Sequence, residues 1–325
     1  MKRIISFVAM LTLVLAFSFN AFAAASSMGN ITERVDEYGQ TVRTYETNGR
    51  SLRSNGLTQT KELLVALGMD KEEVDNLSSD VLNEFANSSY ISVSTAYTKT
   101  DANNQTIYVD EATALAESKR IESERMNNFK QGISPLVTDE FEDTYMKIVH
   151  TATPVGGGTY RFITNATWLT MPFFRGSDSV GSCAMNFTVT NATRNGNYSY
   201  DMNTIELGQI STTKQSRTIT DVKNAVNGNW YGSAGIVYLP NDVYEDTSSV
   251  MYTNYKAHYE YLGKINYPQL ESNFNSVGSY DHATFAVGAS PSLTIDTSGV
   301  SASIGLNVVG VTDTRSAEVS VHYVP

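Results

Sequence analysis

Residues 144–171 read TYMKIVHTATPVGGGTYRFITNATWLTM, and this stretch decides the fold class of the chain. Apolar and polar side chains alternate on both sides of the segment PVGGG, and alternation with a period of two is typical of β-strands. The three glycines at 156–158 suit a tight turn, because glycine adopts positive φ angles at little cost. The stretch therefore predicts two long antiparallel strands joined by a hairpin turn.

Similar strand-like runs, separated by polar turns, continue toward residue 325. About eleven such runs follow from residue 139 onward, with no long helical pattern between them. A series of this kind predicts antiparallel sheets packed face to face, and we expect a β-sandwich domain over residues 139–325. A barrel-like closure of the same strands is the alternative.

The preceding part of the chain has a mixed pattern. Within residues 57–135, the runs TKELLVALG and DKEEVDNL have helical spacing, and Asp70 with Glu73 predicts a capping box. ISVSTAY and TIYV predict a β-hairpin, and a polar helix is expected to follow it. Residues 24–56 hold few apolar side chains and predict a flexible leader. The expected fold class is α+β: a small helical N-terminal region with a hairpin, followed by the antiparallel β-sandwich.

Residues 1–23 have the pattern of a secretory signal peptide. MKR at residues 1–3 precedes an apolar run over residues 4–19, and AFA at residues 21–23 supplies the small residues that signal peptidase requires. The run is shorter than the ~20 residues of a membrane span, so cleavage near Ala23 is expected rather than anchoring. The sequence thus predicts a secreted protein, extracellular or associated with the cell wall, without a transmembrane segment in the mature chain.

Charge and cysteine content argue against a nucleic-acid-binding protein and against a protein stabilised by internal disulfides. The chain has 34 acidic and 23 basic residues, a formal net charge of −11, so it lacks the excess of Lys and Arg on which nucleic-acid binding depends. Cys183 is the single cysteine, which excludes an internal disulfide and leaves stability to core burial. Its apolar neighbours in VGSCAMNFTV predict a buried, unreactive thiol.

Two segments carry a resemblance to known proteins. LGMDKEEVDNLSSDVLNEFANSS at residues 67–89 and NATWLTMPFFRGSDSVG at residues 165–181 resemble uncharacterised secreted proteins of low-GC Gram-positive bacteria. Those chains also run from a signal peptide through short helices into a β-rich half, and the resemblance spans most of the mature chain. It implies export from a Gram-positive cell, and it implies no activity or catalytic residue.

Motifs for catalysis or metal binding do not stand out. Each of the four histidines is isolated in its strand, and no G-x-S-x-G string is present. We therefore expect no catalytic residue, no metal and no cofactor. Paired carboxylates of a glycan hydrolase are the alternative, because that reaction needs two carboxyl groups facing each other across a cleft. The acids that form two clusters are Glu140, Glu142, Asp143, Asp242, Glu245 and Asp246.

Aromatic residues give the candidate ligand surface. The run VMYTNYKAHYEYL at residues 250–262 places Tyr255, Tyr259 and Tyr261 on one face of a strand. Burial in the core is the interpretation that the usual environment of such residues favours. The alternative is an exposed platform that, with Trp230, would contact glycan rings or a protein partner.

Taken together, these patterns favour a secreted bacterial protein that acts as a non-catalytic binding module for a glycan or a protein surface. A membrane-interacting or pore-forming β-protein is one alternative, because residues 291–311 alternate small polar and apolar side chains. A secreted glycan hydrolase with paired carboxylates is the other. The burial of the tyrosine face distinguishes an aromatic platform from an ordinary core.

Overall fold

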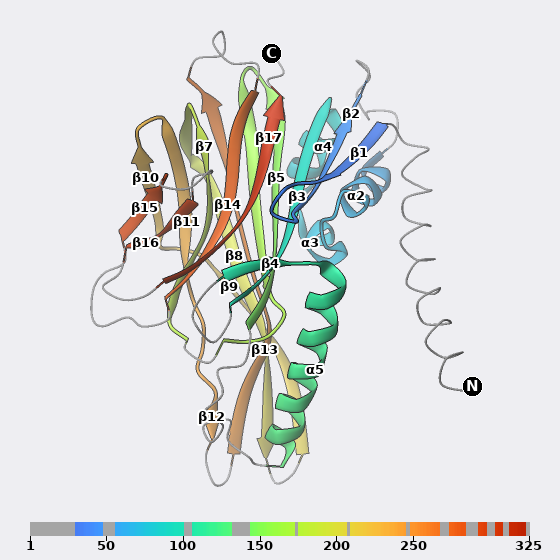
Figure 1. Cartoon of the computed structure of the whole chain (residues 1–325), viewed down its shortest axis with the longest axis vertical. Coiled ribbons are helices and arrows are strands. Elements are labelled where there is room, and N and C mark those ends of the chain that lie inside the picture. Colours follow the sequence, from blue (N-terminus) through green and yellow to red (C-terminus); the bar gives the residue numbers. More distant parts are fainter. Residues whose placement is uncertain are drawn as a thin grey trace, which may run out of the picture.

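Two antiparallel β-sheets lie face to face in the computed structural model, and helices cover part of the outer face of the larger sheet (Figure 1). The antiparallel architecture with two packed sheets that the sequence predicts is confirmed. The structure describes residues 30–47, 56–100, 106–131, 144–172, 175–206, 209–244, 248–266, 273–283, 292–297, 303–307 and 312–322. No helix within these ranges is long and apolar enough to cross a membrane. The signal peptide expected over residues 1–23 lies outside them.

The larger sheet follows the order β1-β2-β3-β5-β6-β13-β8-β9, and every pair of neighbours is antiparallel. Two short strands extend it, β4 beside β3 and β12 beside β13. The bounds are β1 (Asn30–Val35), β2 (Thr41–Glu46), β3 (Tyr90–Thr100), β4 (Thr106–Val109), β5 (Thr144–Gly156), β6 (Thr159–Trp168), β8 (Phe187–Glu206), β9 (Gln209–Thr218), β12 (Val243–Tyr244) and β13 (Ser248–Ile265).

The smaller sheet has the order β10-β11-β7-β14-β17, and a two-stranded hairpin of β15 and β16 forms a third sheet. Its strands are β7 (Ser177–Met185), β10 (Val222–Asn227), β11 (Trp230–Tyr238), β14 (Asn273–Ala283) and β17 (Thr312–His322). The hairpin consists of β15 (Ser292–Asp296) and β16 (Ser303–Asn307). Ile295 of β15 packs with Cys183 and Val277, so this hairpin lies against the smaller sheet.

The hairpin predicted within residues 144–171 is the centre of the larger sheet. β5 and β6 pair from Met146↔Trp168 to Gly156↔Thr159, and φ is positive at all three glycines of the turn. Alternate side chains of both strands belong to the core between the sheets, among them Ile148 and Phe162. Full burial of such a side chain contributes about 1.5–3 kcal/mol, so these strands supply a large share of the core's stability.

Helices α2 (Gly56–Ala66), α3 (Lys71–Asn76) and α4 (Ser79–Asn87) cover the opposite face of the same strands. Leu63, Val74 and Phe85 from the three helices form one apolar cluster with Val149 and Ile163 of β5 and β6. Further along this face, helix α5 (Glu111–Lys130) packs through Ala114 and Ile121 against Tyr97 and Tyr145. Side chains of the central strands are therefore buried on both faces.

The flexible leader expected over residues 24–56 is wrong for its described part. β1 and β2 form a hairpin there, and β2 pairs with β3 from Thr41↔Thr95 to Glu46↔Tyr90. These strands contribute few apolar side chains to the core. Their buried hydrophobic residues are Val42 and Tyr45. Backbone hydrogen bonding to an existing sheet edge orders a segment that its composition alone would leave loose.

The helical region predicted over residues 57–135 is not separate from the β part. β3 lies between β2 and β5 within the larger sheet, and the helices bury their apolar faces on β5 and β6. The domain boundary expected near residues 135–139 therefore does not separate two structural units, because strands from both sides of it belong to the same sheet. Three short helices cannot form a core alone, and the face of β5 and β6 supplies the surface they lack.

Candidate functional site

The tyrosine face of β13 is buried, which confirms the interpretation that the sequence favours, and the alternative of an exposed platform at Tyr255, Tyr259 and Tyr261 is wrong. Each of these side chains is at most 1% exposed. The Tyr259 hydroxyl lies 2.6 Å from Ser233 Oγ, and the Tyr261 hydroxyl donates to the carbonyl of Ser182 at 3.1 Å. The reason is the position of β13 in the middle of the larger sheet, where one face of the strand must contact the smaller sheet.

Trp230 does not share a surface with these tyrosines. It is half-buried at the start of β11 and packs against a separate apolar cluster that includes Cys183 and Ala225. The four aromatic residues singled out by the sequence are therefore not brought together into one ligand surface.

Asp242 is the described member of the two predicted acidic clusters, and it is held by two arginines. Arg175 donates to both of its oxygens, at 2.6 and 2.9 Å, and Arg125 of α5 donates at 2.6 Å. Burial alone would raise the pKa of Asp242, but the arginines hold the pKa of this carboxyl below its ordinary value. Asp242 thus fastens α5 to the strands. Glu140, Glu142, Asp143, Glu245 and Asp246 lie outside the described residues.

Histidines with described side chains are structural. His150 is fully buried between the sheets, where Nε2 lies 2.8 Å from Ser276 Oγ, and burial lowers its pKa to about 3. His258 Nδ1 lies 2.7 Å from Asn165 Oδ1, and His282 Nδ1 lies 2.9 Å from Asp178 Oδ1.

Cys183 is buried, as predicted, and burial raises the pKa of its thiol. A thiol in this setting is a poor nucleophile.

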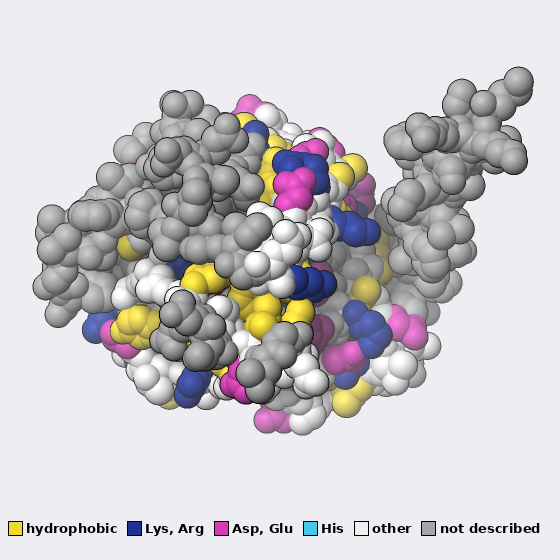
Figure 2. Space-filling view, turned by 90° about the horizontal axis from the view of Figure 1, so that it is seen from below, with side chains coloured by type: hydrophobic (Ala, Val, Ile, Leu, Met, Phe, Trp, Pro, Cys, Tyr) yellow, Lys and Arg dark blue, Asp and Glu magenta, His cyan; other side chains and the backbone are white. Residues whose placement is uncertain are grey.

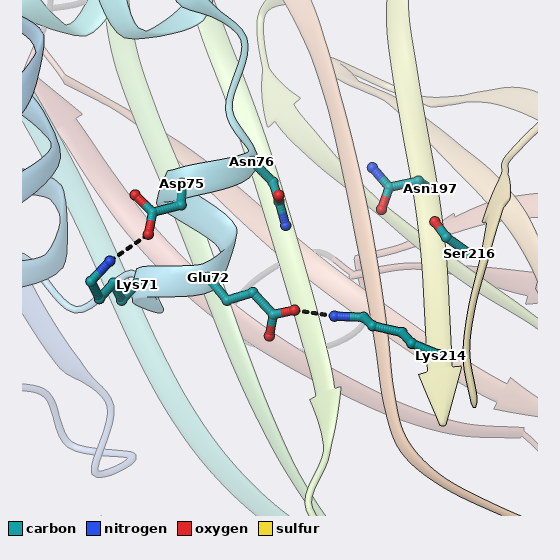
Figure 3. A pocket seen from close by; sticks show the side chains of 7 residues that line it. All are labelled: Lys71, Glu72, Asp75, Asn76, Asn197, Lys214 and Ser216. Carbon is teal, nitrogen blue, oxygen red and sulfur yellow. Dashed lines mark hydrogen bonds and ion pairs between the residues drawn. The ribbon is translucent and has the colours of Figure 1, made fainter. Parts of the chain in front are cut away.

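A polar groove opens on the outer face of the larger sheet, between helix α3 and the strands β8 and β9 (Figure 3). Its volume is about 750 Å³, and it is widely open to solvent. Its lining consists of Lys71, Glu72, Asp75 and Asn76 from α3 and of Asn197, Lys214 and Ser216 from the two strands. Figure 3 shows the Glu72 and Lys214 side chains reaching toward each other between the helix and the strands.

Helix α3 is positioned by Asp70 and Glu73, though not as a full capping box. The Asp70 side chain makes no cap hydrogen bond and instead accepts from Lys147 Nζ at 2.6 Å. The Glu73 carboxyl does return to the Asp70 backbone N–H, but it is buried against the sheet with one oxygen lacking a hydrogen bond. Burial and the neighbouring Asp70 raise the pKa of Glu73 to about 8, so this group is largely neutral at pH 7.

Glu72 connects the helix to the strands on either side of the groove. It forms ion pairs with Lys214 of β9 and with Lys256 of β13, the latter at 2.6 Å. Hydrogen bonds from these two lysines lower the pKa of Glu72 to about 2. At the outer end of α3, Asp75 pairs with Lys71 at 2.5 Å and with Lys61 at 3.1 Å. Charges along the wall of the groove are therefore paired.

A second ion cluster holds α4 on the sheet beside the groove. Arg161 of β6 pairs with Glu84 of α4 and with Glu260 of β13, the latter at 3.1 Å. Asn195 of β8 donates to the other oxygen of Glu260 at 3.3 Å. Ion pairs thus hold both helices on this face of the sheet, α3 through Glu72 and α4 through Glu84.

The groove offers hydrogen bonds rather than a reactive group. Its amide, hydroxyl, carboxylate and ammonium groups can donate to and accept from a polar ligand. The carboxyl with the raised pKa, Glu73, is not among the lining residues. In the described part of the chain, no group of three His, Cys, Asp or Glu side chains is arranged to hold a metal ion.

Sequence reasoning did not find the groove, because its two sides are more than a hundred residues apart. DKEEVDNL was recognised as a helix, and Ser216 lies in the run Gln215–Thr220, which predicts a strand; Lys214 falls just before that run. No local pattern brings these segments together.

Figure 2 shows another face, the lower end of the molecule, where acidic and basic side chains are intermixed around a group of hydrophobic ones.

Comparisons with known proteins identify no family. No family model matches the chain, and no curated protein matches it. Among solved structures, one that is similar is the collagen-binding subdomain of the Enterococcus faecalis surface protein ACE, which is 8% identical. The match covers 52% of this chain and 90% of that chain with a TM-score of 0.20. A similarity at that TM-score carries no argument about function.

Proposed function

We propose that this protein is a secreted, non-catalytic binding module that holds a glycan in the groove between α3 and the strands β8 and β9. The observation that carries the proposal is the open groove of about 750 Å³ with a wholly polar set of lining side chains. Residues 1–23 support secretion, because they have the three parts of a signal peptide.

A glycan fits the chemistry of the lining. Sugar hydroxyls both donate and accept hydrogen bonds, and the groove offers both kinds of partner through Asn76, Asn197 and Ser216. The charged residues Glu72 and Lys214 are already paired, which favours a neutral polar ligand over a strongly charged one.

Hydrolysis of that glycan is disfavoured by the same groups. A glycosidase needs a protonated acid facing the scissile bond and a second carboxylate beside it. Glu72 and Asp75 are held ionised by lysines, and neutral Glu73 is buried beneath the helix. The groove therefore has carboxylates without a general acid directed into it.

A glycan array probed with the mature chain, residues 24–325, tests the proposal. We expect binding to one glycan class, reduced at least about tenfold by the double substitution Asn197→Ala/Ser216→Ala, which removes two hydrogen-bonding groups. Asn83→Ala on the exposed side of α4 is the matched control and should bind as the unaltered chain does. An array without binding, or equal binding by the double variant, would contradict the proposal.

Pore formation remains a second candidate because of one observation. The β15–β16 hairpin, which lies within the alternating segment at residues 291–311, packs against the body of the protein as a separate two-stranded unit. It is held there in part by Asn227, whose side-chain amide donates to the carbonyl of Ile295 at 2.8 Å. Release of a dye from liposomes by the mature chain tests this function, and intact liposomes at high protein concentration would exclude it.

A further inference from the structure

The larger sheet ends in two edge strands, β1 and β9, and in the described residues neither has a second neighbour. β9 pairs with β8 in an unbroken register from Asn197↔Thr218 to Glu206↔Gln209. It contains no proline and no bulge, and all of its residues except Gln215 are exposed. A long, regular, exposed edge of this kind is a template for pairing with another strand.

β1 presents a comparable edge on the far side of the same sheet. Its register with β2 is unbroken over six residues, from Asn30↔Glu46 to Val35↔Thr41. Thr32, Glu33, Arg34 and Val35 are exposed, and Val35 is 63% exposed. β1 is an extended strand that the chain already holds in place, so pairing it would require no ordering of a loose peptide.

The directions of the two strands match each other. The path from β1 to β9 contains eight strands, and each neighbouring pair is antiparallel. β1 and β9 therefore point in opposite directions. If a second copy is placed beside the first in the same orientation, its β1 lies antiparallel to β9 of the first copy, and the alternation of the sheet continues.

Charges on the two edges are complementary. β9 carries Lys214 and Arg217 and no acidic residue. β1 with the turn that follows carries Glu33, Asp36 and Glu37 against the single base Arg34. Glu33 pairs with Arg43 beside the helix cluster, and Lys214 pairs with Glu72 of α3, so both side chains lie on the helix-covered face of the sheet. In a continuous sheet they would stand on the same side.

We propose that copies of this chain associate head to tail, with β1 of one copy adding antiparallel to β9 of the next. The contact uses two different surfaces, so an assembly of any length keeps a free β1 at one end and a free β9 at the other and stays open. The inference is independent of the glycan proposal, because it rests on the sheet edges and not on the groove.

Sedimentation velocity of the mature chain over a wide concentration range tests the proposal. We expect the mean mass to rise through dimers to larger species as concentration increases. A mass that stays at the monomer, or that stops at a dimer, would overturn the proposal, because a closed symmetric pair would use one kind of edge only.

Substitutions on β9 locate the contact. In an edge strand, alternate residues direct their N–H groups away from the sheet, so either Thr212→Pro or Thr213→Pro removes an outward donor without breaking the pairing with β8. Circular dichroism identifies which of the two stays folded. That variant should associate at least about tenfold more weakly and keep its glycan binding. Unchanged association would place the contact elsewhere and overturn the proposal.

A charge exchange gives a second test that does not depend on proline. Glu33→Lys and Lys214→Glu each also place a like charge beside Arg43 or Glu72 of the same copy. Each should weaken association, and the double variant should recover it relative to the two single variants, because only the attraction between the edges is restored. Lys119→Glu on the exposed side of α5 is the matched control. Failure of the double variant to recover association would contradict the pairing of these two edges.

Discussion

The Asp242 carboxylate accepts hydrogen bonds from both terminal nitrogens of Arg175, at 2.6 and 2.9 Å. Arg125 of α5 donates to the same carboxylate, and the backbone N–H of Tyr252 donates to it at 2.8 Å. One acid thus joins the helix, the segment after β6 and the strand β13. Asp242 was a candidate for catalysis in the sequence, and its surroundings make it a structural centre.

Replacing Asp242 should destabilise the fold strongly. Asp242→Asn leaves Arg175 buried without its counter-charge and leaves Arg125 with Glu122 alone, and breaking a buried ion pair in this way costs about 3–5 kcal/mol. Urea denaturation measures the free energy of unfolding. Asp75→Asn, in an exposed ion pair on α3, should change it little. Equal effects of the two substitutions would show that Asp242 has no special role.

Neighbouring acids on α3 should respond to pH in opposite directions. The pKa of Glu73 is raised to about 8 from an ordinary value of 4.5, so folding is favoured by its proton, and this contribution is lost as pH rises from about 4.5 through 8. Glu73→Gln should therefore stabilise the protein at pH 8 relative to the unaltered chain, with little difference below pH 4.5. Urea denaturation at both pH values measures this.

For Glu72 the expected dependence of stability on pH has the opposite sign. Its pKa is lowered to about 2, so its ion pairs contribute to stability above pH 4.5, and that contribution is lost as pH falls toward 2. Glu72→Gln should reduce stability at pH 7, by a modest amount because the ion pairs are largely exposed. If both glutamine variants change stability with the same pH dependence, the assigned environments are wrong.

The buried tyrosines of β13 should matter for stability and not for ligand binding. Tyr261→Ala removes a fully buried aromatic ring and should cost about 3–5 kcal/mol, whereas Tyr259→Phe loses only the hydrogen bond to Ser233 and should cost about 1 kcal/mol. Tyr238→Ala is the control, because that side chain is 51% exposed. Thermal or urea denaturation ranks the three. A larger loss for Tyr238→Ala than for Tyr261→Ala would contradict the core assignment.

Contact between the sheets should be sensitive to one added methyl group at Gly278. A Cβ built there would lie 2.7 Å from the His150 ring, so Gly278→Ala must shift either the ring or the strand β14. Overpacking of this kind costs about 1–3 kcal/mol. Gly176→Ala serves as the control, because no atom lies within 4 Å of its added Cβ. Equal stability of the two variants would show that the sheets accommodate the added methyl group beside His150 without loss of folding free energy.

Local sequence patterns predicted helices and strands well, but they predicted poorly which other segments those helices and strands contact. Ser78 and Asp110 precede the helices α4 and α5, and each accepts a hydrogen bond from the backbone N–H three residues on, as the local spacing of a helix cap requires. Asp70 was recognised by the same rule, but its side chain pairs with Lys147 instead, because β5 places an ammonium group within reach. A cap can be recognised from sequence spacing, whereas a competing partner from another element cannot.

The candidate groove could not have been predicted from the sequence for the same reason. Its side chains come from one short helix and two strands, and each segment taken alone resembles an ordinary solvated surface. Tertiary contacts of α3, namely the packing of Val74 on the outer face of the sheet and the ion pairs of Glu72, bring the helix beside β9, which carries Lys214 and Ser216.

Alternation within residues 144–171 determined by itself that this protein has a β-rich core, because the direction of each side chain in a strand depends only on the neighbouring backbone. The same rule placed Tyr255, Tyr259 and Tyr261 on one face. The tertiary structure alone decided which partner covers that face, that residues 30–46 add to the sheet, and that a groove forms between α3 and β9. These outcomes depend on pairing and packing between distant segments, and no local period in the sequence encodes them.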